Sequence, residues 1–341
     1  MLNPEQDPRP EFAFINWVRN QSRSRPEVVV SIGDDAAILN APGRQWISTV
    51  DVLAEGVHFS LENVPPELVG RKALAVNLSD IAAMAGEPCA AFVGLVLPQD
   101  RTREFAEAIY RGLFSLAEEW NVCIAGGDTN SWNGPLVISV TLLGLTTGGG
   151  LLRRGGTSDR SAHVQSSAHV SEQTASGGPV LRCGAKPGDW ILVTGALGGS
   201  LASGRHLTFT PRIREALALH QQVTLHALID LSDGLSSDLF QILDQSGVGA
   251  VLDGDDIPIH DDVDASRPHE ERLQHALNDG EDFELLLTVS PEQGRQLLRS
   301  PPFETRLTKI GEITATPGAA LRRGERVTTL TRGGWSHRFG E

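Results

Sequence analysis

Aspartates follow apolar runs at several places in this chain, and they restrict how it can fold. The runs Val28–Ile32, Val122–Ala125 and Ala227–Ile229 each lead into an acidic motif. Because a buried carboxylate loses its hydration, each such aspartate needs a compensating partner, and few basic residues lie beside these motifs. A hard divalent cation such as Mg²⁺, which binds oxygen ligands and is often shared with phosphates, is the simplest compensation. The motifs are Gly33-Asp34-Asp35, Thr49-Val50-Asp51, Asn77-Leu78-Ser79-Asp80, Gly126-Gly127-Asp128-Thr129 and Asp230-Leu231-Ser232-Asp233-Gly234.

Length and charge set the broad class of protein. A chain of 341 residues is expected to form roughly two domains. Its net charge of −14 disfavours nonspecific binding to nucleic acid or to an anionic membrane. No apolar run of about 18 residues predicts a transmembrane helix, and no signal peptide is recognised after Met1. We therefore expect a cytoplasmic protein.

The three cysteines, Cys89, Cys123 and Cys183, are scattered and share no metal-binding spacing. An odd number of isolated cysteines argues against both a disulfide framework and a thiolate metal site. We expect them to be small buried side chains.

The first unit, residues 1–146, mixes expected helices and strands. Apolar residues at helical spacing predict helices, and short apolar runs that end at Gly, Pro or Asp predict strands. Asp80 falls inside an expected helix, whereas Asp51 is expected at the end of a strand. The expected helices are Glu11–Arg19, Leu68–Met84 and Thr102–Trp120, and the expected strands are Val28–Ile32, Trp46–Val50, Ala91–Leu97, Val122–Ala125 and Leu136–Leu145.

Residues 147–180 differ from the rest of the chain. They combine glycines with Ser, His, Gln and Thr, and they carry too little apolar surface to offset the entropy of ordering, so we expect a mobile insertion. His163 and His169 are formal metal candidates, but a solvated low-complexity loop is the favoured interpretation.

The second unit, residues 181–341, is also expected to mix strands and helices. The turn Gly195–Ser200 could present backbone N–H groups to an anion, although ordinary strand-to-helix turns also need glycine. Asp230 and Asp233 are three residues apart and can face one site. The expected strands are Asp189–Thr194, Thr224–Ile229, Ala250–Leu252 and Phe283–Val289, and Ser236–Ser246 is expected to be a helix that begins with Ser/Asp capping.

Common catalytic motifs are absent from the sequence. There is no Gly-x-x-x-x-Gly-Lys-[Ser/Thr] phosphate loop, no Gly-x-Ser-x-Gly elbow, no His-Glu-x-x-His and no protein-kinase motif set. A turn explains any single Asp motif, since Gly and Asp are common turn formers. Turns do not explain why carboxylates recur beside apolar runs in both units.

Taken together, the motifs resemble the thiamine-monophosphate kinase family, in the superfamily of aminoimidazole-ribonucleotide synthetase. The likeness runs in order over nearly the whole chain except the insertion and the extreme N-terminus. It implies an α+β (mixed α/β) fold of two domains, with the N-terminal sheets of two copies joined in a homodimer. The segments that carry it are Gly33–Ala37, Asp51, Gly56–Phe59, Lys72–Met84, Gly126–Thr129, Arg182–Asp189, Asp230–Leu235 and Gly280–Leu285.

The resemblance also implies the reaction and the site. The reaction is Mg²⁺-dependent transfer of the ATP γ-phosphate to thiamine monophosphate; whether K⁺ assists is left open. The metal-binding positions are Asp35, Thr49, Val50, Asp51, Asp80, Asp128, Asp230 and Asp233, of which Asp51, Asp128 and Asp233 are assigned the catalytic role. The ATP-binding positions are Thr49, Trp120, Gly127, Asp128, Arg182 and Ser232, and the substrate-binding positions are His58, Glu281 and Trp335.

Several of these positions have plain structural explanations. Trp120 could be a core residue at a helix end, Arg182 a surface arginine and Ser232 a helix cap, while His58 and Trp335 could be structural. Two residues also depart from the family pattern. Val50 replaces a usual threonine, so only its carbonyl could bind metal, and Asp279 replaces a usual glycine before Glu281.

Two other functions remain open at this level. The first is another activity of the superfamily, although selenophosphate synthesis would call for a reactive Cys and a Lys that residues 1–32 lack. The second is a noncatalytic maturation or scaffold protein, whose hydrogenase-maturation relative uses a C-terminal cysteine, whereas this chain ends Arg338-Phe339-Gly340-Glu341.

Overall fold

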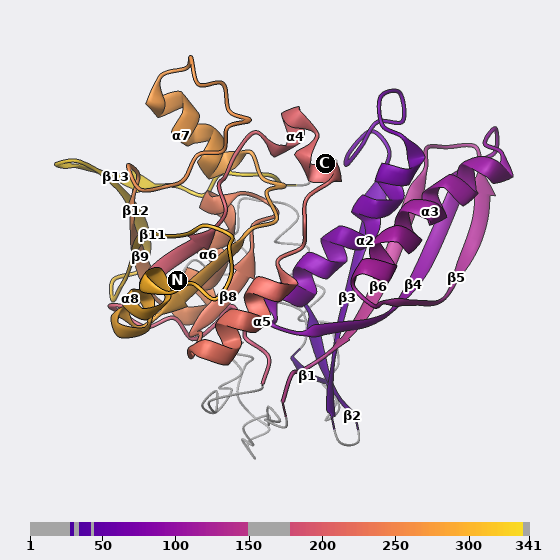
Figure 1. Cartoon of the computed structure of the whole chain (residues 1–341). Helices are drawn as coiled ribbons and strands as arrows, with labels where there is room; N and C mark the ends of the chain where they lie inside the picture. Colours follow the sequence, from indigo (N-terminus) through magenta and orange to yellow (C-terminus); the bar gives the residue numbers. More distant parts are fainter. Residues whose placement is uncertain (1–27, 31–33, 42–43, 149–177, 337–341) are drawn as a thin grey trace, which may run out of the picture.

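The computed structural model describes residues 28–30, 34–41, 44–148 and 178–336, which form two halves, each built around one mixed sheet (Figure 1). The expected α+β architecture with two domains is confirmed. The expected helix Glu11–Arg19 and most of the expected insertion 147–180 lie outside the described residues. Among the described residues, no helix is long and apolar enough to cross a bilayer.

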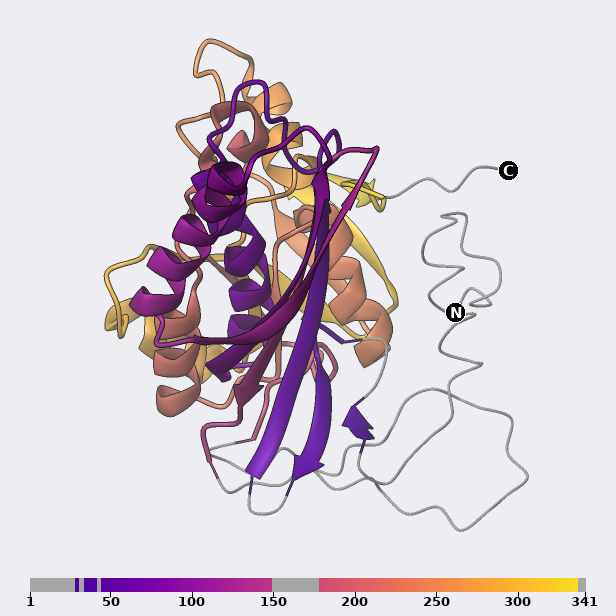
Figure 2. The same cartoon turned by 90° about the vertical axis from the view of Figure 1, so that its right-hand side faces the viewer.

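The first half is a six-stranded sheet with helices on one face. Its strand order is β1-β2-β3-β6-β4-β5, and every neighbouring pair is antiparallel except β4 and β5. The two helices, α2 (Pro66–Ala83) and α3 (Arg103–Glu119), lie on the same side of this sheet (Figure 2). The strands are β1 (Val28–Val30), β2 (Ala37–Ala41), β3 (Arg44–Ala54), β4 (Glu87–Pro98), β5 (Cys123–Trp132) and β6 (Val137–Leu145).

Two glycines let α2 and α3 pack closely. A Cβ atom on Gly70 would lie 1.9 Å from the carbonyl oxygen of Ile109, and one on Gly112 would lie 1.8 Å from that of Glu67. Any larger side chain would force the helices apart. The inner helix, α2, also contacts α5 and β8 of the second half, so it lies between the two halves (Figure 1).

The other face of the first sheet carries exposed apolar side chains. Val50 is 59% exposed, Val52 55% and Phe92 43%. Their neighbours along β3, Thr49 and Leu53, are buried on the helix-covered face, as the alternation of side chains along a strand requires. No described helix covers the exposed face.

The second half is a seven-stranded sheet with strand order β13-β12-β9-β11-β7-β10-β8, in which only β9 and β12 pair in parallel. Its strands are β7 (Trp190–Thr194), β8 (Ala227–Asp230), β9 (Gly249–Asp253), β10 (Leu285–Val289), β11 (Leu307–Thr314), β12 (Gly318–Arg323) and β13 (Arg326–Leu330). Its helices are α4 (Ser200–Ser203), the 3-10 helix η2 (Arg205–Leu207), α5 (Ile213–Gln222), α6 (Leu235–Ser246), α7 (His269–Asn278) and α8 (Pro291–Arg299).

Two strands extend beyond their expected ends. The strand expected at Trp46–Val50 continues as β3 to Ala54, so Asp51 lies within a strand rather than after one. The strand expected at Val122–Ala125 continues as β5 to Trp132. Pairing with β4 supplies the backbone hydrogen bonds for this extension, and its polar sequence has no pattern that predicts a strand. The expectation of buried cysteines is wrong, since Cys123 on this edge strand is exposed and Cys89 and Cys183 are half-buried.

The start of α6 also differs from the expectation. Its N-cap is Gly234, which has no side-chain cap. Instead, the Asp238 carboxylate in the first turn accepts hydrogen bonds from the backbone N–H groups of Asp233 and Gly234, both at 3.1 Å. Asp238 therefore fixes the turn that follows β8.

Candidate active site

Three aspartates from both halves meet at their junction. Asp35 follows β1, Asp80 lies near the end of α2, and Asp230 is the last residue of β8. Each offers a carboxylate oxygen, and these oxygens all lie within 4.8 Å of one another. Among the described residues, this is the only group of three or more acidic, His or Cys side chains with that spacing.

Neighbouring hydroxyl groups hold two of these carboxylates. Ser79 Oγ on α2 donates to Asp230 Oδ2 at 2.6 Å, which bridges the two halves. Thr49 Oγ1 on β3 donates to Asp80 Oδ2. The sequence places Ser79 directly before Asp80, yet its role was missed because the partner lies 151 residues away in the chain.

Burial makes the negative charge of this cluster expensive. It raises the pKa of Asp80 well above its usual range, and the nearby charges of Asp51 and Asp230 add to the shift. Burial, followed by the charge of Asp35, raises the pKa of Asp230 in the same direction. Burial also raises the pKa of Asp51 to about 6, although its hydrogen bond with Asp80 works the other way. The cluster thus lacks positive charge.

Arg182 supplies part of that charge. Its Nε and one terminal nitrogen each lie 2.7 Å from an oxygen of Asp35, in a two-pronged contact. Its backbone N–H donates to Asp34 Oδ2 at 3.3 Å. Burial, with the charge of Asp35, still raises the pKa of Asp34 to about 7. Arg182 is therefore bound to the acidic cluster rather than lying on the surface.

Asp128 lies at a distance from this cluster. Across the first sheet, Asp51 pairs with Val140 of β6, which pairs with Val93 of β4, which pairs with Gly127 of β5. Three strand spacings of about 4.8 Å separate Asp51 from Gly127 by roughly 14 Å, and Asp128 is the next residue. Asp128 is exposed on the edge strand. Because side chains alternate along a strand, the Asp128 side chain faces the side of the sheet that carries Val50, opposite to Asp51.

The surroundings of Val50 and Gly127 follow from their places in the first sheet. The Val50 side chain lies on the face opposite to Asp51 and is largely exposed. A Cβ atom on Gly127 would lie 2.0 Å from the carbonyl oxygen of Val93, so close strand packing by itself requires glycine there.

The turn after β8 brings several expected residues together. The backbone N–H of Glu281 donates to the carbonyl of Ser232 at 2.7 Å, and the N–H of Trp335 donates to that of Asp233 at 2.9 Å. The Trp335 side chain is about half exposed. Positions assigned to the nucleotide and to the substrate are therefore adjacent in space.

Glu281 and His58 meet at Lys72, a residue that the sequence analysis did not assign. Lys72 Nζ lies 2.6 Å from Glu281 Oε2 and 2.9 Å from the carbonyl oxygen of His58. The His58 ring itself accepts the backbone N–H of Ala54 through Nδ1 at 3.0 Å. A lysine within an apolar helical run was the available signal.

Trp120 is buried at the C-terminal end of α3. The guanidinium carbon of Arg214, on α5 of the second half, lies 5.0 Å from its ring centroid. Among the described residues its indole nitrogen has no hydrogen-bond partner. Trp120 thus packs between the halves, with one buried donor left over.

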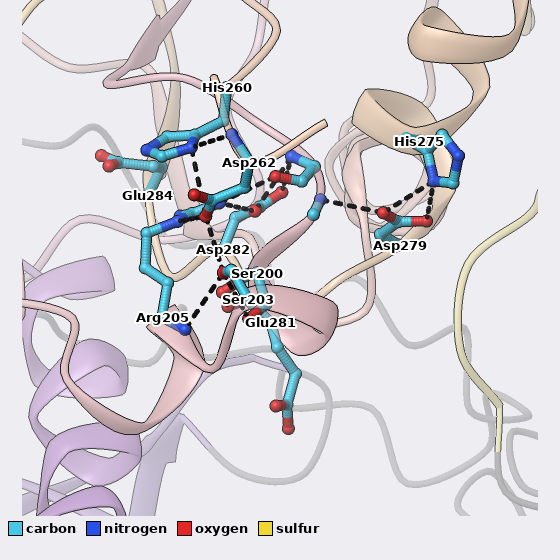
Figure 3. Close-up of polar contacts among 12 residues, drawn as sticks. Ser200, Ser203, Arg205, His260, Asp262, His275, Asp279, Glu281, Asp282 and Glu284 are labelled. Carbon is cyan, nitrogen blue, oxygen red and sulfur yellow. Dashed lines mark hydrogen bonds and ion pairs between the residues drawn. The ribbon is translucent and has the colours of Figure 1, made fainter. Parts of the chain in front are cut away.

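The glycine turn of the second half is already occupied by carboxylates (Figure 3). The N–H of Gly198 donates to both oxygens of Asp282, at 3.0 and 2.9 Å, and the N–H of Gly199 donates to Asp279 Oδ2 at 2.9 Å. These N–H groups therefore serve the chain's own carboxylates rather than an external anion. Asp279, the departure from the family pattern, is accommodated because it also contacts His275.

The donor set of the cluster suits a hard cation. Asp35, Asp80 and Asp230 offer only oxygen atoms, they converge from two halves, and their buried charge exceeds what Arg182 balances. Mg²⁺ prefers such ligands and usually shares them with phosphate oxygens. The residues present therefore fit a magnesium site.

Known proteins are similar to this chain in sequence and fold. Residues 33–146 match the family described as AIR synthase related protein, N-terminal domain, and residues 186–323 match its C-terminal domain. Thiamine-monophosphate kinase of Rhodopirellula baltica is 38% identical over 318 residues, which cover 90% of each chain. The solved structure described as AaThiL complexed with AMPPCP and TMP has a TM-score of 0.74 and 28% identity, covering 96% of this chain and 97% of that one. Thiamine-monophosphate kinase of Stenotrophomonas maltophilia K279a has a TM-score of 0.67 and 31% identity, covering 92% and 96%.

Proposed function

The chain belongs to the thiamine-monophosphate kinase family, and we propose that it transfers the γ-phosphate of ATP to thiamine monophosphate, giving thiamine diphosphate and ADP. The observation that carries this proposal is the convergence of Asp35, Asp80 and Asp230 from both halves. Two anionic substrates can react only where positive charge is gathered, and this cluster is built to gather it.

The metal ligands of the proposal are Asp35, Asp51, Asp80 and Asp230, with Thr49 holding Asp80. When bound, Mg²⁺ would offset the negative charge of the phosphate oxygens. Asp128 and Asp233 are proposed to contact the more distant part of the nucleotide–metal complex. Support comes from the family match. K⁺ as a further activator remains part of the proposal.

The chain's own residues would orient the reactants rather than transfer protons. A phosphate monoester has a second pKa of about 6, so the attacking oxygen of thiamine monophosphate is already largely ionised near neutral pH. That oxygen would form a bond to the γ-phosphorus of ATP while the bond to the β,γ-bridging oxygen breaks, and ADP leaves with that electron pair. No general base is needed.

Binding roles follow from position. Arg182, Ser232, Gly127 and Trp120 are proposed to contact the nucleotide; the buried indole nitrogen of Trp120 is a donor that a ligand could use. Glu281, His58 and Trp335 are proposed to contact the thiamine end, since a carboxylate and an aromatic face both attract the cationic thiazolium ring. The side chains of Val50 and Asp128 face away from the cluster, so neither assignment gains support from the geometry.

A homodimer through the first sheet is also part of the proposal. The exposed side chains of Val50, Val52 and Phe92 give that sheet an apolar face, and a second copy would bury it. Val52→Glu should give monomers in sedimentation experiments. Val327→Glu, at a valine 58% exposed on β13, is the matched control and should leave the assembly unchanged. A dimer that survives Val52→Glu would contradict this interface.

The domain limits are proposed as 1–146, 147–180 and 181–341. The first sheet ends at Leu145 and the second begins at Trp190, which supports a boundary between them.

Product analysis tests the function directly. The folded chain is incubated with ATP, Mg²⁺ and thiamine monophosphate, and thiamine diphosphate and ADP are measured by chromatography. ADP release that depends on thiamine monophosphate supports the proposal. Folded protein that forms no thiamine diphosphate contradicts it, and metal binding without nucleotide binding would favour a noncatalytic scaffold.

A further inference from the structure

Lys72 is a charged residue buried completely between the two halves. Its side chain on α2 is 0% exposed. Its ammonium nitrogen lies 2.9 Å from the carbonyl oxygen of His58, 2.8 Å from His206 Nδ1, and 2.8 and 2.6 Å from the two oxygens of Glu281. His58 belongs to the first half, whereas His206 and Glu281 belong to the second. One nitrogen thus ties the loop after β3 to η2 and to the loop before β10.

Lysine suits this position better than arginine. An ammonium group is compact and has three donors that can point in three directions, whereas a guanidinium is a planar fork. The three groups around Lys72 Nζ are a carbonyl, an imidazole and a carboxylate. The chain has only three lysines, Lys72, Lys186 and Lys309, and all its other permanently basic side chains are arginines.

The cluster balances its own charge. Burial lowers the pKa of Lys72, while the charge of Glu281 opposes the shift. Burial also acts to raise the pKa of Glu281, but a hydrogen bond with His206 and the charge of Lys72 outweigh it, so this pKa is lowered. His206 Nδ1 also lies 2.8 Å from Glu281 Oε2, so Nδ1 either accepts from the lysine or, in the tautomer that carries hydrogen there, donates to the carboxylate.

Glu281 needs such an anchor. Its backbone has a φ of 55°, in the left-handed region that favours glycine, and its side chain points away from Asp282 and Asp262 (Figure 3). The Glu281 side chain is 21% exposed, so part of it remains available to a ligand. Its backbone N–H donates to Ser232, two residues after Asp230 of the acidic cluster.

We propose that Lys72 is a positioning residue for thiamine monophosphate: braced against the His58 carbonyl oxygen, it fixes the Glu281 carboxylate in place without touching the substrate. This inference rests on the proposed function, which assigns both residues to the thiamine end. Within the described residues, the polar contacts of Lys72 go to His58, His206 and Glu281 and not to the acidic cluster. Its effect should therefore be specific to thiamine monophosphate and should leave ATP recognition intact.

Lys72→Met tests the proposal, because methionine keeps most of the length and removes the charge and the donors. Steady-state rates are measured while each substrate is varied in turn. We expect the KM for thiamine monophosphate to rise at least about 10-fold, the loss that misplacing a binding group typically causes, while the KM for ATP changes less than about 2-fold. Lys309→Met is the control, since Lys309 forms a 2.7 Å pair with Glu312 away from Glu281, and should change neither constant.

A double-mutant cycle separates positioning from a merely structural role. Glu281→Gln is combined with Lys72→Met, which also removes the uncompensated buried carboxylate and so restores folding if the single variant fails to fold. If Lys72 acts through Glu281, the double variant has a KM for thiamine monophosphate within about 2-fold of Glu281→Gln alone. A further rise of about 10-fold, an equal rise for ATP, or unchanged constants in Lys72→Met would each overturn the proposal.

Failure of the proposed function is seen separately. If the unaltered chain forms no thiamine diphosphate, the function and the inference that rests on it both fail. If the unaltered chain is active, the variants test the positioning role alone.

Discussion

Two buried charge clusters lie at the junction of the halves, and they differ in how their charge is balanced. The acidic cluster gathers Asp35, Asp80 and Asp230 around a single arginine contact, that of Arg182. The Lys72 cluster pairs one ammonium with one carboxylate and one imidazole. The first raises the pKa of its carboxylates, whereas the second lowers that of Glu281.

The difference shows which cluster awaits an outside ion. Carboxylates with raised pKa values are held at a cost until a cation joins them, because a shifted pKa is a free-energy difference between protonation states. A cluster that balances itself gains nothing from a further ion. The acidic cluster is therefore suited to binding metal, and the Lys72 cluster is suited to holding a fixed shape.

Asp80→Asn should give the largest effect, because it removes a ligand from the centre of the acidic cluster. We expect turnover to fall by about 10³-fold, the upper range for losing one charge-stabilising group. The metal-free protein should become more stable near pH 7, because asparagine carries no charge to bury, and Thr49 can still donate to its oxygen. Turnover and thermal unfolding are measured on the same preparation.

Asp100→Asn is the matched control for Asp80→Asn. Asp100 lies on the surface after β4, with a largely exposed side chain. It should change neither turnover nor the unfolding temperature. Normal turnover of Asp80→Asn would remove Asp80 from the metal site.

Arg182→Met should give the next largest effect, on stability. It removes both guanidinium contacts of Asp35, and breaking one side of a buried pair costs about 3 kcal/mol or more. Part of this loss should return when Mg²⁺ is added, since the ion supplies positive charge to the same carboxylates. Chemical denaturation with and without Mg²⁺ measures both quantities.

Arg212→Met provides a close comparison for Arg182→Met. Arg212 makes the same two-pronged contact, with Glu284 at 2.8 and 2.6 Å, and the two arginine side chains are 21% and 19% exposed. The Arg212→Met variant should also be less stable than the unaltered chain, but Mg²⁺ should not restore its stability. Equal recovery of both variants would mean that Mg²⁺ acts nonspecifically.

Stabilisation by Mg²⁺ should depend on pH. At a concentration of 100 times its dissociation constant, an ion that binds only the folded state adds about 2.7 kcal/mol. Binding requires ionised carboxylates, and burial raises the pKa of Asp51 to about 6. The stabilisation should therefore be large at pH 8 and weaken as pH falls through 6.

The same pKa shifts predict the opposite trend without metal. A carboxylate whose folded pKa is raised adds stability at low pH, and this stability is lost as pH rises through the folded value. Metal-free protein should thus lose stability towards pH 7, where Mg²⁺ binding grows. Unfolding temperatures are measured across pH with Mg²⁺ and, as the control, with NaCl at equal ionic strength. The same change of unfolding temperature with pH in both series would contradict this prediction.

The sequence predicted the acidic cluster better than the Lys72 cluster, and the reason is local. Asp230 was expected beside an apolar strand, and it is the last residue of β8; Asp80 was expected within a helix, and it lies in α2. Those expectations need only a few neighbouring residues. Lys72 and Glu281 are 209 residues apart, and no local pattern reports that they meet.

Strand ends were the weakest expectation for the same reason. Asp51 was expected after a strand, but β3 continues past it, because β6 offers partners as far as Ala54. Asp128 was expected after a strand, but parallel pairing with β4 carries β5 to Trp132. Backbone hydrogen bonds to a distant strand decide where a strand stops, and a single sequence does not contain them in readable form.

Asp282 lies next to the Lys72 cluster in the chain but resembles the acidic cluster in its pKa. It follows Glu281 directly, yet burial raises its pKa to about 7, although the N–H of Gly198 and the charge of Arg205 act to lower it. Because its pKa is raised in the folded state, Asp282 adds stability that is lost as pH rises from about 4 to 7. Between pH 5.5 and 6.5, Asp282→Asn should remove up to about 1.4 kcal/mol of this pH dependence, the limit for one group over one pH unit.

Asp262→Asn tests whether that change belongs to Asp282. Asp262 contacts the same Arg205, at 2.8 Å, but hydrogen bonds from Arg205 and Ser203 outweigh its slight burial and lower its pKa. Its contribution is present above its unfolded pKa and is lost as pH falls. Asp262→Asn should therefore lower stability by a constant amount above that pKa, and it should change the pH dependence of stability only in acid, in the opposite direction to Asp282→Asn. Denaturation curves from pH 3 to 8 would contradict the assignment if Asp282→Asn kept the full slope above pH 5. In that case the positive charge of Arg205 offsets the Asp282 carboxylate as fully as Lys72 offsets Glu281. Carboxylates that need a metal ion to offset their charge would then be confined to the acidic cluster.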